Sequence, residues 1–282
     1  MSGRSCTLLV ETEQEPGAAA SSVDRQKPVR SEVLAVSGEE SFVSESTPEV
    51  LVLLPAHDEE SSIGRVLEEL RQVAPTFDRL VINDGSIDDT SAVVDRLGER
   101  ELRIPFNLGY GGALQVGLRY ALAAGYEIVV FLDADGQHRA EDVPRLVTAM
   151  RTGRADVVIG SRYVGEDPYE GPLGRRVGQR LFSLFSSIVT DKRIWDTTSG
   201  LKAMKRSAFQ PLTTGTFLDF HAEALVKWSL LGLSVEEIPV AVRRREHGSS
   251  MHGWGSALGY PVKTLLLTLV AATDVWIGKR RR

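Results

Sequence analysis

The stretch Ile128-Val-Val-Phe-Leu-Asp-Ala-Asp-Gly-Gln-His138 joins an apolar run directly to two aspartates and a glycine. A continuous apolar run ended by turn residues predicts a strand, Ile128–Leu132, that is buried on both faces. Asp133 and Asp135 then stand one residue apart at its carboxyl end. Asp-x-Asp alone is more typical of a solvated turn, but its position after a buried strand favours a functional site.

On both sides of this stretch, apolar runs alternate with segments of helical periodicity. We predict strands at 50–54, 79–82, 102–105, 155–159 and 234–242, and helices at 61–73, 90–97, 112–124, 175–189 and 220–231. Pro55 is expected to end the first strand. The alternation indicates an α/β fold with a Rossmann-like, mostly parallel central sheet and helices on both faces. Ligands of such sheets bind outside the carboxyl ends of the strands.

Polar residues follow each of the first four predicted strands: Asp58 and Glu59, then Asp84, then Asn107, then Asp133 and Asp135. Asp84 is equally typical of a turn that caps the next helix and of an acceptor for a nucleobase imide or a ribose hydroxyl. Glu59 is either a ribose acceptor or an acid favoured by the dipole at a helix start. Their common edge of the sheet favours a binding site.

The segment Asn107-Leu-Gly-Tyr-Gly-Gly112 places three glycines ahead of a predicted helix. Glycines allow backbone N–H groups to approach a phosphate or a sugar. The spacing matches neither the P-loop nor the dinucleotide fingerprint, which counts against a P-loop NTPase and a nicotinamide-dependent enzyme.

Asp133 and Asp135 can converge on one cation if the turn aims them together, and Gln137 and His138 follow closely enough to complete its coordination. Oxygen ligands suit a hard cation, so we expect Mg²⁺ or Mn²⁺. Such a cation would neutralise a diphosphate and stabilise it as a leaving group.

Negative charge is concentrated near the N-terminus. The formal net charge of the 282 residues is −5, and residues 1–49 carry nine acids and four bases, which alone give −5. The remainder is neutral overall and offers no basic field for nucleic acid. We expect residues 1–48 to be a disordered acidic leader without the apolar segment of a signal peptide. The single cysteine, Cys6, excludes a disulfide framework.

Seven segments taken together resemble the family 2 glycosyltransferases of GT-A fold, and within them the transferases that use polyprenyl phosphates, such as the dolichol-phosphate mannose synthases. They run in family order over about residues 50–252: Pro55-Ala-His-Asp-Glu-Glu60, Asn83-Asp-Gly-Ser-Ile-Asp-Asp-Thr90, Asn107-Leu-Gly-Tyr-Gly-Gly-Ala113, Asp133-Ala-Asp-Gly-Gln-His138, Gly160-Ser-Arg-Tyr163, Asp196-Thr-Thr-Ser-Gly-Leu-Lys202 and Arg245-Glu-His-Gly-Ser-Ser250. The ordered set is specific, although each segment alone is not.

The resemblance implies a role for each matching position. The residues that would contact the nucleotide sugar are Pro55, Ala56, Glu59, Asp84, Asn107, Gly112, Asp133 and Ala134. Asp135 and Gln137, with Asp133, would hold the metal. The residues that would bind phosphates or the acceptor are Arg162, Arg175, Arg176, Ser199 and Arg245, with Asp196 near the transferred sugar. His57-Asp58 and Asn83 depart from the Tyr-Asn and Asp common in the family, which leaves the base selectivity open.

The resemblance also implies a reaction, in which a hexose moves from a UDP- or GDP-sugar by in-line displacement with inversion. A polyprenyl phosphate acceptor is already ionised near pH 7 and needs little help from a base. A hydroxyl on a small-molecule or natural-product acceptor needs a carboxylate to take its proton, and the candidates are Asp196, Asp219 and Glu223. Both acceptors stay open, as do a sugar-1-phosphate nucleotidylyltransferase and a catalytically inactive nucleotide-binding module.

We expect a glycosyltransferase domain over residues 49–252 and a C-terminal amphipathic helix with a basic tail over residues 253–282. The apolar run Thr264–Ala272 is shorter than the roughly 20 residues that a membrane-spanning helix requires. This segment fits either a helix on the cytoplasmic face of a membrane or one packed on the domain or a dimer partner. We therefore expect a cytoplasmic protein, with peripheral membrane association as one alternative.

Overall fold

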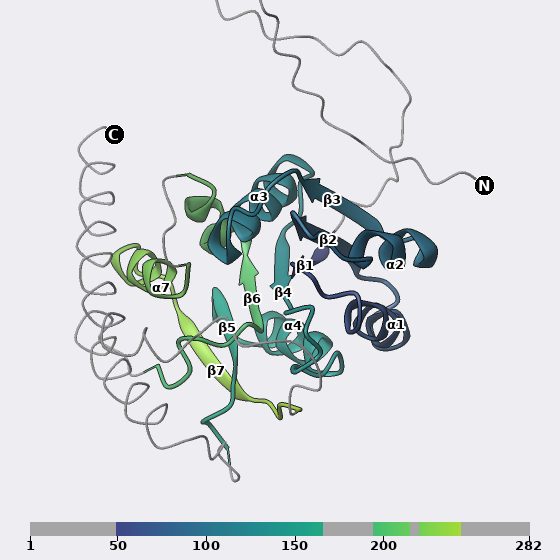
Figure 1. The fold of residues 1–282 in the computed structure, drawn as a ribbon. Coiled ribbons are helices and arrows are strands. Elements are labelled where there is room, and N and C mark those ends of the chain that lie inside the picture. The colour runs from purple at the N-terminus through teal and green to yellow at the C-terminus, as the bar shows by residue number, and fades with distance from the viewer. Residues whose placement is uncertain (1–48, 166–193, 215–219, 244–282) are drawn as a thin grey trace, which may run out of the picture.

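The computed structural model describes residues 49–165, 194–214 and 220–243, except the side chains of 221–223 and 226. In these residues the strands form one sheet in the order β3-β2-β1-β4-β6-β5-β7 (Figure 1). The strands are β1 Val50–Ala56, β2 Asp78–Asp84, β3 Arg100–Ile104, β4 Ile128–Phe131, β5 Val157–Ser161, β6 Lys202–Lys205 and β7 Val235–Pro239. All run in one direction except β6, which is antiparallel to β4 and β5. The mostly parallel sheet predicted from the sequence is confirmed.

Helices cover both faces of the sheet, as predicted. The helices are α1 Ile63–Val73, α2 Thr90–Leu97, α3 Tyr110–Ala123, α4 Asp142–Thr152, α6 Arg206–Phe209 and α7 Phe220–Leu230, with a 3₁₀ turn at Gln210–Leu212. β1 supplies Val52 and Leu54 to the core shared with α1, α2 and α4, and Leu51 and Leu53 to the core shared with α3 and α7. A strand with apolar side chains on both faces is therefore buried on both faces.

The first strand does not end at Pro55, contrary to the prediction, because β1 pairs with β2 as far as Ala56. Pairing with β4 stops at Leu53, whose carbonyl accepts a hydrogen bond from the Leu132 amide at 3.1 Å. Residues two apart in a strand turn their backbone polar groups the same way. The nitrogen of Pro55 therefore faces the region beyond β4, where no ladder hydrogen bond is required.

The strand β6 places its first residue level with the last residue of β4, since Lys202 pairs with Phe131. Because β6 runs against its neighbours, the residues that precede it lie at the same edge as the residues that follow β4 and β5. This edge collects chain segments that are far apart in sequence.

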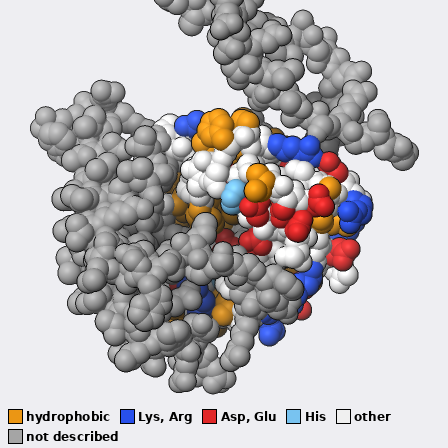
Figure 2. Space-filling view, viewed as in Figure 1, with side chains coloured by type: hydrophobic (Ala, Val, Ile, Leu, Met, Phe, Trp, Pro, Cys, Tyr) orange, Lys and Arg blue, Asp and Glu red, His pale blue; other side chains and the backbone are white. Residues whose placement is uncertain are grey.

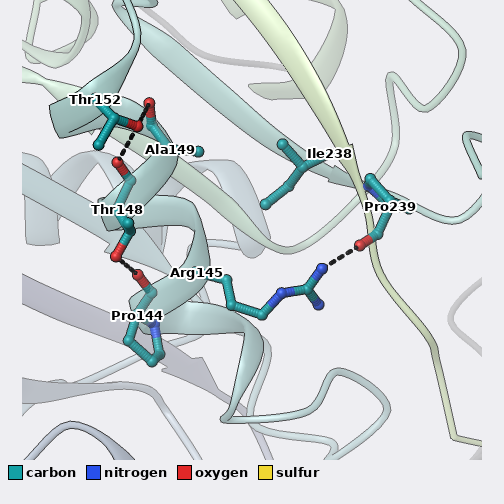
Figure 3. A pocket seen from close by; sticks show the side chains of 7 residues that line it. All are labelled: Pro144, Arg145, Thr148, Ala149, Thr152, Ile238 and Pro239. Atoms are coloured by element: carbon teal, nitrogen blue, oxygen red, sulfur yellow. Dashed lines mark hydrogen bonds between the residues drawn. The ribbon is translucent and has the colours of Figure 1, made fainter.

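A groove between α4 and the edge strand β7 lies outside the predicted site (Figure 3). Arg145 reaches across it and donates a hydrogen bond to the carbonyl of Pro239 at 3.1 Å. The remaining lining residues are Pro144, Thr148, Ala149, Thr152 and Ile238. None of the site residues predicted from the sequence lines this groove.

Among the described residues, no helix has both the length and the apolar character needed to cross a membrane.

Gly117 brings α3 close to the sheet, because a Cβ at this position would overlap Ile82 Cδ1 and crowd Leu53. Gly117→Val should therefore destabilise the fold by about 1–3 kcal/mol through overpacking, although helix propensity alone slightly favours Val over Gly. Urea unfolding measures the difference. Ala123→Val on the exposed side of the same helix is the control and should stay within about 0.5 kcal/mol of the parent. Equal effects at both positions would contradict the close contact.

Candidate functional site

The predicted site residues that the structure describes stand at the carboxyl edge of the sheet. Asp84 is the last residue of β2, Asp133 follows β4, Arg162 follows β5, and Asp196 precedes β6. The chain passes outward from β1 to β2 and β3 on one side, and β4 lies on the other side. The predicted aspartate pair thus follows the strand next to β1, where the strand order reverses and ligands of α/β sheets bind.

The loops after β1 and β2 hold each other through reciprocal hydrogen bonds. Asp58 accepts a hydrogen bond from the Ile87 amide at 2.8 Å, and the Asp58 amide donates to Ser86 Oγ at 3.0 Å. In the same way, the Glu60 carboxylate accepts a hydrogen bond from the Asp89 amide, and the Asp88 carboxylate accepts one from the Glu60 amide. Figure 2 shows acidic side chains gathered on the face that includes these loops. These four contacts, three of them to carboxylates, fix the loops that flank Asp84.

Asp84 and Asn107 hold His57 in one tautomer. The carbonyl of Asp84 can only accept, so His57 Nδ1 donates to it at 2.9 Å and His57 Nε2 accepts from the Asn107 amide at 3.0 Å. The buried Asp84 carboxylate accepts a hydrogen bond from the Leu108 amide at 2.7 Å. The structure therefore brings together two of the residues predicted to contact the nucleoside, and adds His57 to them.

Glu59 lies beside the start of α1, where its carboxylate accepts a hydrogen bond from Ser62 Oγ at 2.6 Å. This contact matches the alternative of an acid at a helix N-terminus, which the macrodipole favours. Pro55 and Ala56 form the end of β1. Gly112 lies in the first turn of α3, where a Cβ would lie 2.7 Å from the Cβ of Leu108.

Asp133 is enclosed by residues from three separate segments. Its Oδ1 accepts a hydrogen bond from the Tyr110 hydroxyl at 3.1 Å, and its carboxylate lies directly against the Gly200 backbone. Burial and the neighbouring Asp135 charge raise the pKa of Asp133 to about 6, against the lowering effects of Tyr110, Lys202 and Arg162. Burial and the charge of Asp133 raise the pKa of Tyr110 well above its usual value, so this hydroxyl keeps its proton.

The carboxylate oxygens of Asp133 and Asp135 fit a hard cation that takes some of its ligands from the protein and the others from a bound substrate. Asp135 Oδ1 accepts a hydrogen bond from the Gln137 amide at 3.0 Å, which closes the turn. No group of three or more His, Cys, Asp or Glu side chains in the described residues could hold a metal by itself. Mg²⁺ usually binds through one or two carboxylates, with water and substrate phosphates as its other ligands. Two carboxylates that repel each other suit that arrangement.

His138 is buried, and its Nδ1 has no hydrogen-bond partner among the described residues. Burial, with Arg162 and Lys202 nearby, lowers the pKa of His138 to about 4, so the ring is neutral at pH 7. The loop that carries it is held by the segment after β7. The Arg243 amide donates to the carbonyl of Gln137 at 2.8 Å, and Val242 forms a bridge with His138.

Arg162 and Asp196 form a buried, bidentate ion pair. Arg162 Nε donates to Asp196 Oδ2 at 2.8 Å and Nη2 donates to Oδ1 at 2.7 Å, with the Arg162 amide at 2.9 Å from Oδ2. Burial by itself would raise the pKa of Asp196, but these donors hold that pKa below its ordinary value. Asp196 is therefore a weak base in this arrangement, and Glu237 fixes its backbone by accepting the amides of Trp195 and Asp196.

The hydroxyl of Ser199 points into the protein and is used in backbone contacts. The side chain is fully buried, and Oγ donates to the carbonyl of Gly160 at 2.7 Å while accepting the Leu201 amide at 3.1 Å. A residue with its hydrogen bonds used in this way joins β5 to the start of β6. The Ser199 side chain thus supports the backbone of the site, and its place near an acceptor stays a prediction.

Besides His57, three site neighbours were not predicted from the sequence. Tyr110 touches Asp133. The ammonium of Lys202, a residue with 1% of its surface exposed, bonds the carbonyl of Ser199, and Glu237 anchors Asp196. Lys202 is the first residue of β6, whose sequence Lys-Ala-Met-Lys carries no signal that this lysine is buried. Tyr110 and Glu237 carry no signal of their contacts either.

Four predicted positions cannot be located. Arg175, Arg176 and Arg245 lie outside the described residues, and so does the side chain of Glu223 on α7. The alternative proton acceptor Asp219 also lies outside them. The roles assigned to these residues stay predictions, as do the leader at 1–48 and the segment 253–282.

The ion pair generates a prediction about stability. Arg162→Met leaves Asp196 buried without its partner, which should cost about 3–5 kcal/mol at pH 7.5. The penalty should shrink towards pH 4.5, because without the Arg162 guanidinium burial would raise the pKa of Asp196, and the buried carboxyl of the variant would lose its unpaired charge by taking up a proton as the pH falls. Urea unfolding at both pH values measures it. Arg151→Met, which removes an exposed pair with Glu49, should cost at most about 1 kcal/mol. A similar, pH-independent loss in both variants would contradict this account.

Comparisons with known proteins agree with the geometry. Residues 51–213 match the model of the family described as Glycosyl transferase family 2. The undecaprenyl-phosphate mannosyltransferase of Micrococcus luteus is 31% identical over 83% of this chain and 98% of its own length. The polyprenol monophosphomannose synthase of Mycolicibacterium smegmatis is 29% identical over 76% of this chain and 84% of its own.

Solved structures are similar in fold. Glucosyl-3-phosphoglycerate synthase from Mycobacterium tuberculosis, crystallised with Mn²⁺ and UDP-glucose, superposes with a TM-score of 0.61. The alignment covers 78% of this chain and 79% of that one at 24% identity. A likeness at this identity shows the fold, which is the GT-A fold expected from the sequence.

Proposed function

Since the chain belongs to glycosyl transferase family 2 and is a glycosyltransferase, we propose that it moves a hexose from a nucleoside diphosphate sugar to a polyprenyl phosphate. Two relatives that align over most of their length are named as transferases of this kind. The observation that carries the proposal is the convergence at one sheet edge of the Asp133–Asp135 turn with the Arg162–Asp196 pair.

The nucleoside would bind beside Asp84, at the edge formed by β1 and β2. Asp84 is held by Leu108 and His57 is fixed between Asp84 and Asn107, so these groups are ordered before a ligand arrives. Ordered polar groups lower the entropic cost of binding. UDP- and GDP-sugars are the donors we propose, with Pro55 and Ala56 contributing the wall at the end of β1.

Asp133, Asp135 and Gln137 would hold Mg²⁺ or Mn²⁺. When bound, the cation supplies positive charge that stabilises the diphosphate as it leaves. The chain's part is to keep the two carboxylates close despite their repulsion, which the contacts of Asp133 with Tyr110 and Gly200 support. Lys202 and Arg162 lower the cost of these buried charges.

In the proposed reaction, a phosphate oxygen of the acceptor attacks the anomeric carbon from the side opposite the diphosphate. A carbon–oxygen bond to the acceptor forms as the bond to the nucleoside diphosphate breaks, and the configuration inverts. An ionised phosphate has no proton to lose, so no general base is required. That suits Asp196, whose carboxylate is occupied by Arg162 and is a weak base.

The acceptor phosphate would bind beside the arginines at the β5 end of the site. Arg162 stays charged at every working pH and lies next to the Asp-x-Asp turn. We propose Arg175, Arg176 and Arg245 as further phosphate ligands. Arg243, which hydrogen-bonds to Gln137 and pairs with Glu69, leads the chain past the turn two residues before Arg245. The acceptor would be met at the cytoplasmic face of a membrane, through peripheral association.

The test is transfer of label from UDP-[¹⁴C]glucose, UDP-[¹⁴C]N-acetylglucosamine or GDP-[¹⁴C]mannose to undecaprenyl phosphate in detergent, followed by butanol extraction. We expect butanol-soluble label that requires Mg²⁺ or Mn²⁺ and is released by mild acid. Label that stays in the aqueous phase on a small molecule would support the alternative acceptor, and label that is indifferent to EDTA would contradict the metal.

Asp135→Asn tests the metal ligand in the same assay. We expect kcat to fall by roughly 100-fold or more, since metal stabilisation of a leaving group contributes several kcal/mol. Asp95→Asn is the matched control, because Asp95 lies on α2 and pairs with Arg103 at an exposed position. Unchanged turnover in Asp135→Asn would overturn the role of this carboxylate.

A further inference from the structure

The segment Asn107–Tyr110 forms hydrogen bonds with two of the three aspartates of the proposed donor site, Asp84 and Asp133. The Leu108 amide donates to Asp84 Oδ1 at 2.7 Å, and the Tyr110 hydroxyl donates to Asp133 Oδ1 at 3.1 Å. These aspartates follow β2 and β4, which are separated by β1 in the sheet. One loop thus spans the site from the proposed nucleoside pocket to the proposed metal ligand.

Gly200 sets the position of the same carboxylate from the other side. A Cβ on Gly200 would overlap both Asp133 oxygens. Gly200 is not among the described glycines with a positive φ, so its backbone conformation is open to any residue. The glycine is required for space, because Asp133 occupies the volume that a side chain would take.

From these two contacts, we propose that Tyr110 and Gly200 are positioning residues that set the Asp133 carboxylate for metal and diphosphate before either binds. The inference rests on the proposed function. Tyr110 fixes Oδ1 by donation, and the Gly200 backbone provides the surface on which the carboxylate lies. The Leu108 contact extends the same ordered loop to Asp84, so that one short segment orders both ends of the donor site.

The physical basis is the orientation of a metal ligand by a neighbouring hydrogen bond. A carboxylate that could rotate about its side-chain torsions would have to be ordered when the cation binds, which weakens affinity. Partners of metal ligands typically contribute 10- to 100-fold to metal affinity. Tyr110 holds the ligand but does not itself bind metal or substrate, so its loss should change affinity more than the chemistry.

The test is Tyr110→Phe, which removes one hydroxyl and keeps the ring. Mn²⁺ is titrated into the protein, with and without UDP, and free Mn²⁺ is followed by its electron paramagnetic resonance signal. We expect the Kd for Mn²⁺ to rise about 10-fold or more, and in the transfer assay the Mn²⁺ concentration for half-maximal rate should rise while kcat at saturating Mn²⁺ falls less. Tyr120→Phe, on the same helix, is the control.

A Kd within about threefold of the parent value in Tyr110→Phe would overturn the positioning role, even if the parent protein transfers sugar as proposed. A parent protein that binds no Mn²⁺ under either condition would overturn it as well. The proposed function is decided separately, by whether label reaches the polyprenyl phosphate.

Gly200→Ala tests the second contact. The added methyl must displace the Asp133 carboxylate, so Mn²⁺ affinity should fall by at least as much as in Tyr110→Phe. Gly64→Ala on α1, where a Cβ would lie 3.2 Å from a Val93 methyl, should bind Mn²⁺ like the parent. A folded Gly200→Ala protein with parental Mn²⁺ affinity would contradict the role of Gly200, and Tyr110→Phe still tests the proposal if Gly200→Ala does not fold.

Discussion

The reversed direction of β6 is the constraint on which the rest of the site depends. Because β6 runs against β4 and β5, its first residues arrive at the edge where those strands end. Asp196, Gly200 and Lys202 are thereby brought against Asp133 and Arg162, more than 30 residues away in sequence. If β6 were parallel to its neighbours, the segment before it would lie at the opposite edge of the sheet.

Charge in this part of the site is arranged around a buried carboxylate, Asp196, and a partly buried one, Asp133. Arg162 neutralises Asp196 through two side-chain hydrogen bonds, whereas Asp133 receives only a neutral hydroxyl and the weaker, longer-range influence of Lys202 and Arg162. The two aspartates therefore differ in character: one is paired within the chain, and the other carries a raised pKa beside a second carboxylate. A proposed cation partner suits the second kind, because an unpaired buried charge is costly.

The sequence predicted the order of the elements, because strands buried on both faces and helices with one apolar face leave strong periodic signals. Helix α2 was predicted at its observed limits, and β4 within one residue. Helix α4, strand β6 and the short helix α6 were not predicted. The end of β1 was misplaced, since a proline limits a strand only where a neighbour needs its amide. The inward direction of the Ser199 hydroxyl was not predicted, because a motif gives residue types in order but not the direction in which each side chain points. Tyr110 and Glu237 act on aspartates 23 and 41 residues away, and local patterns carry no information about such contacts.

Pro55 reduces the number of backbone groups that need a partner where β1 extends beyond the end of β4. Elsewhere in a central strand, separating two neighbours exposes an N–H that must find water or another acceptor. Here the residue that lies beyond the end of β4 has no N–H to satisfy, so its carbonyl is the single backbone group at this position that needs a hydrogen-bond partner. The proline that was predicted to end the strand therefore lies inside β1, at the point where the strand has one hydrogen-bond donor fewer to satisfy.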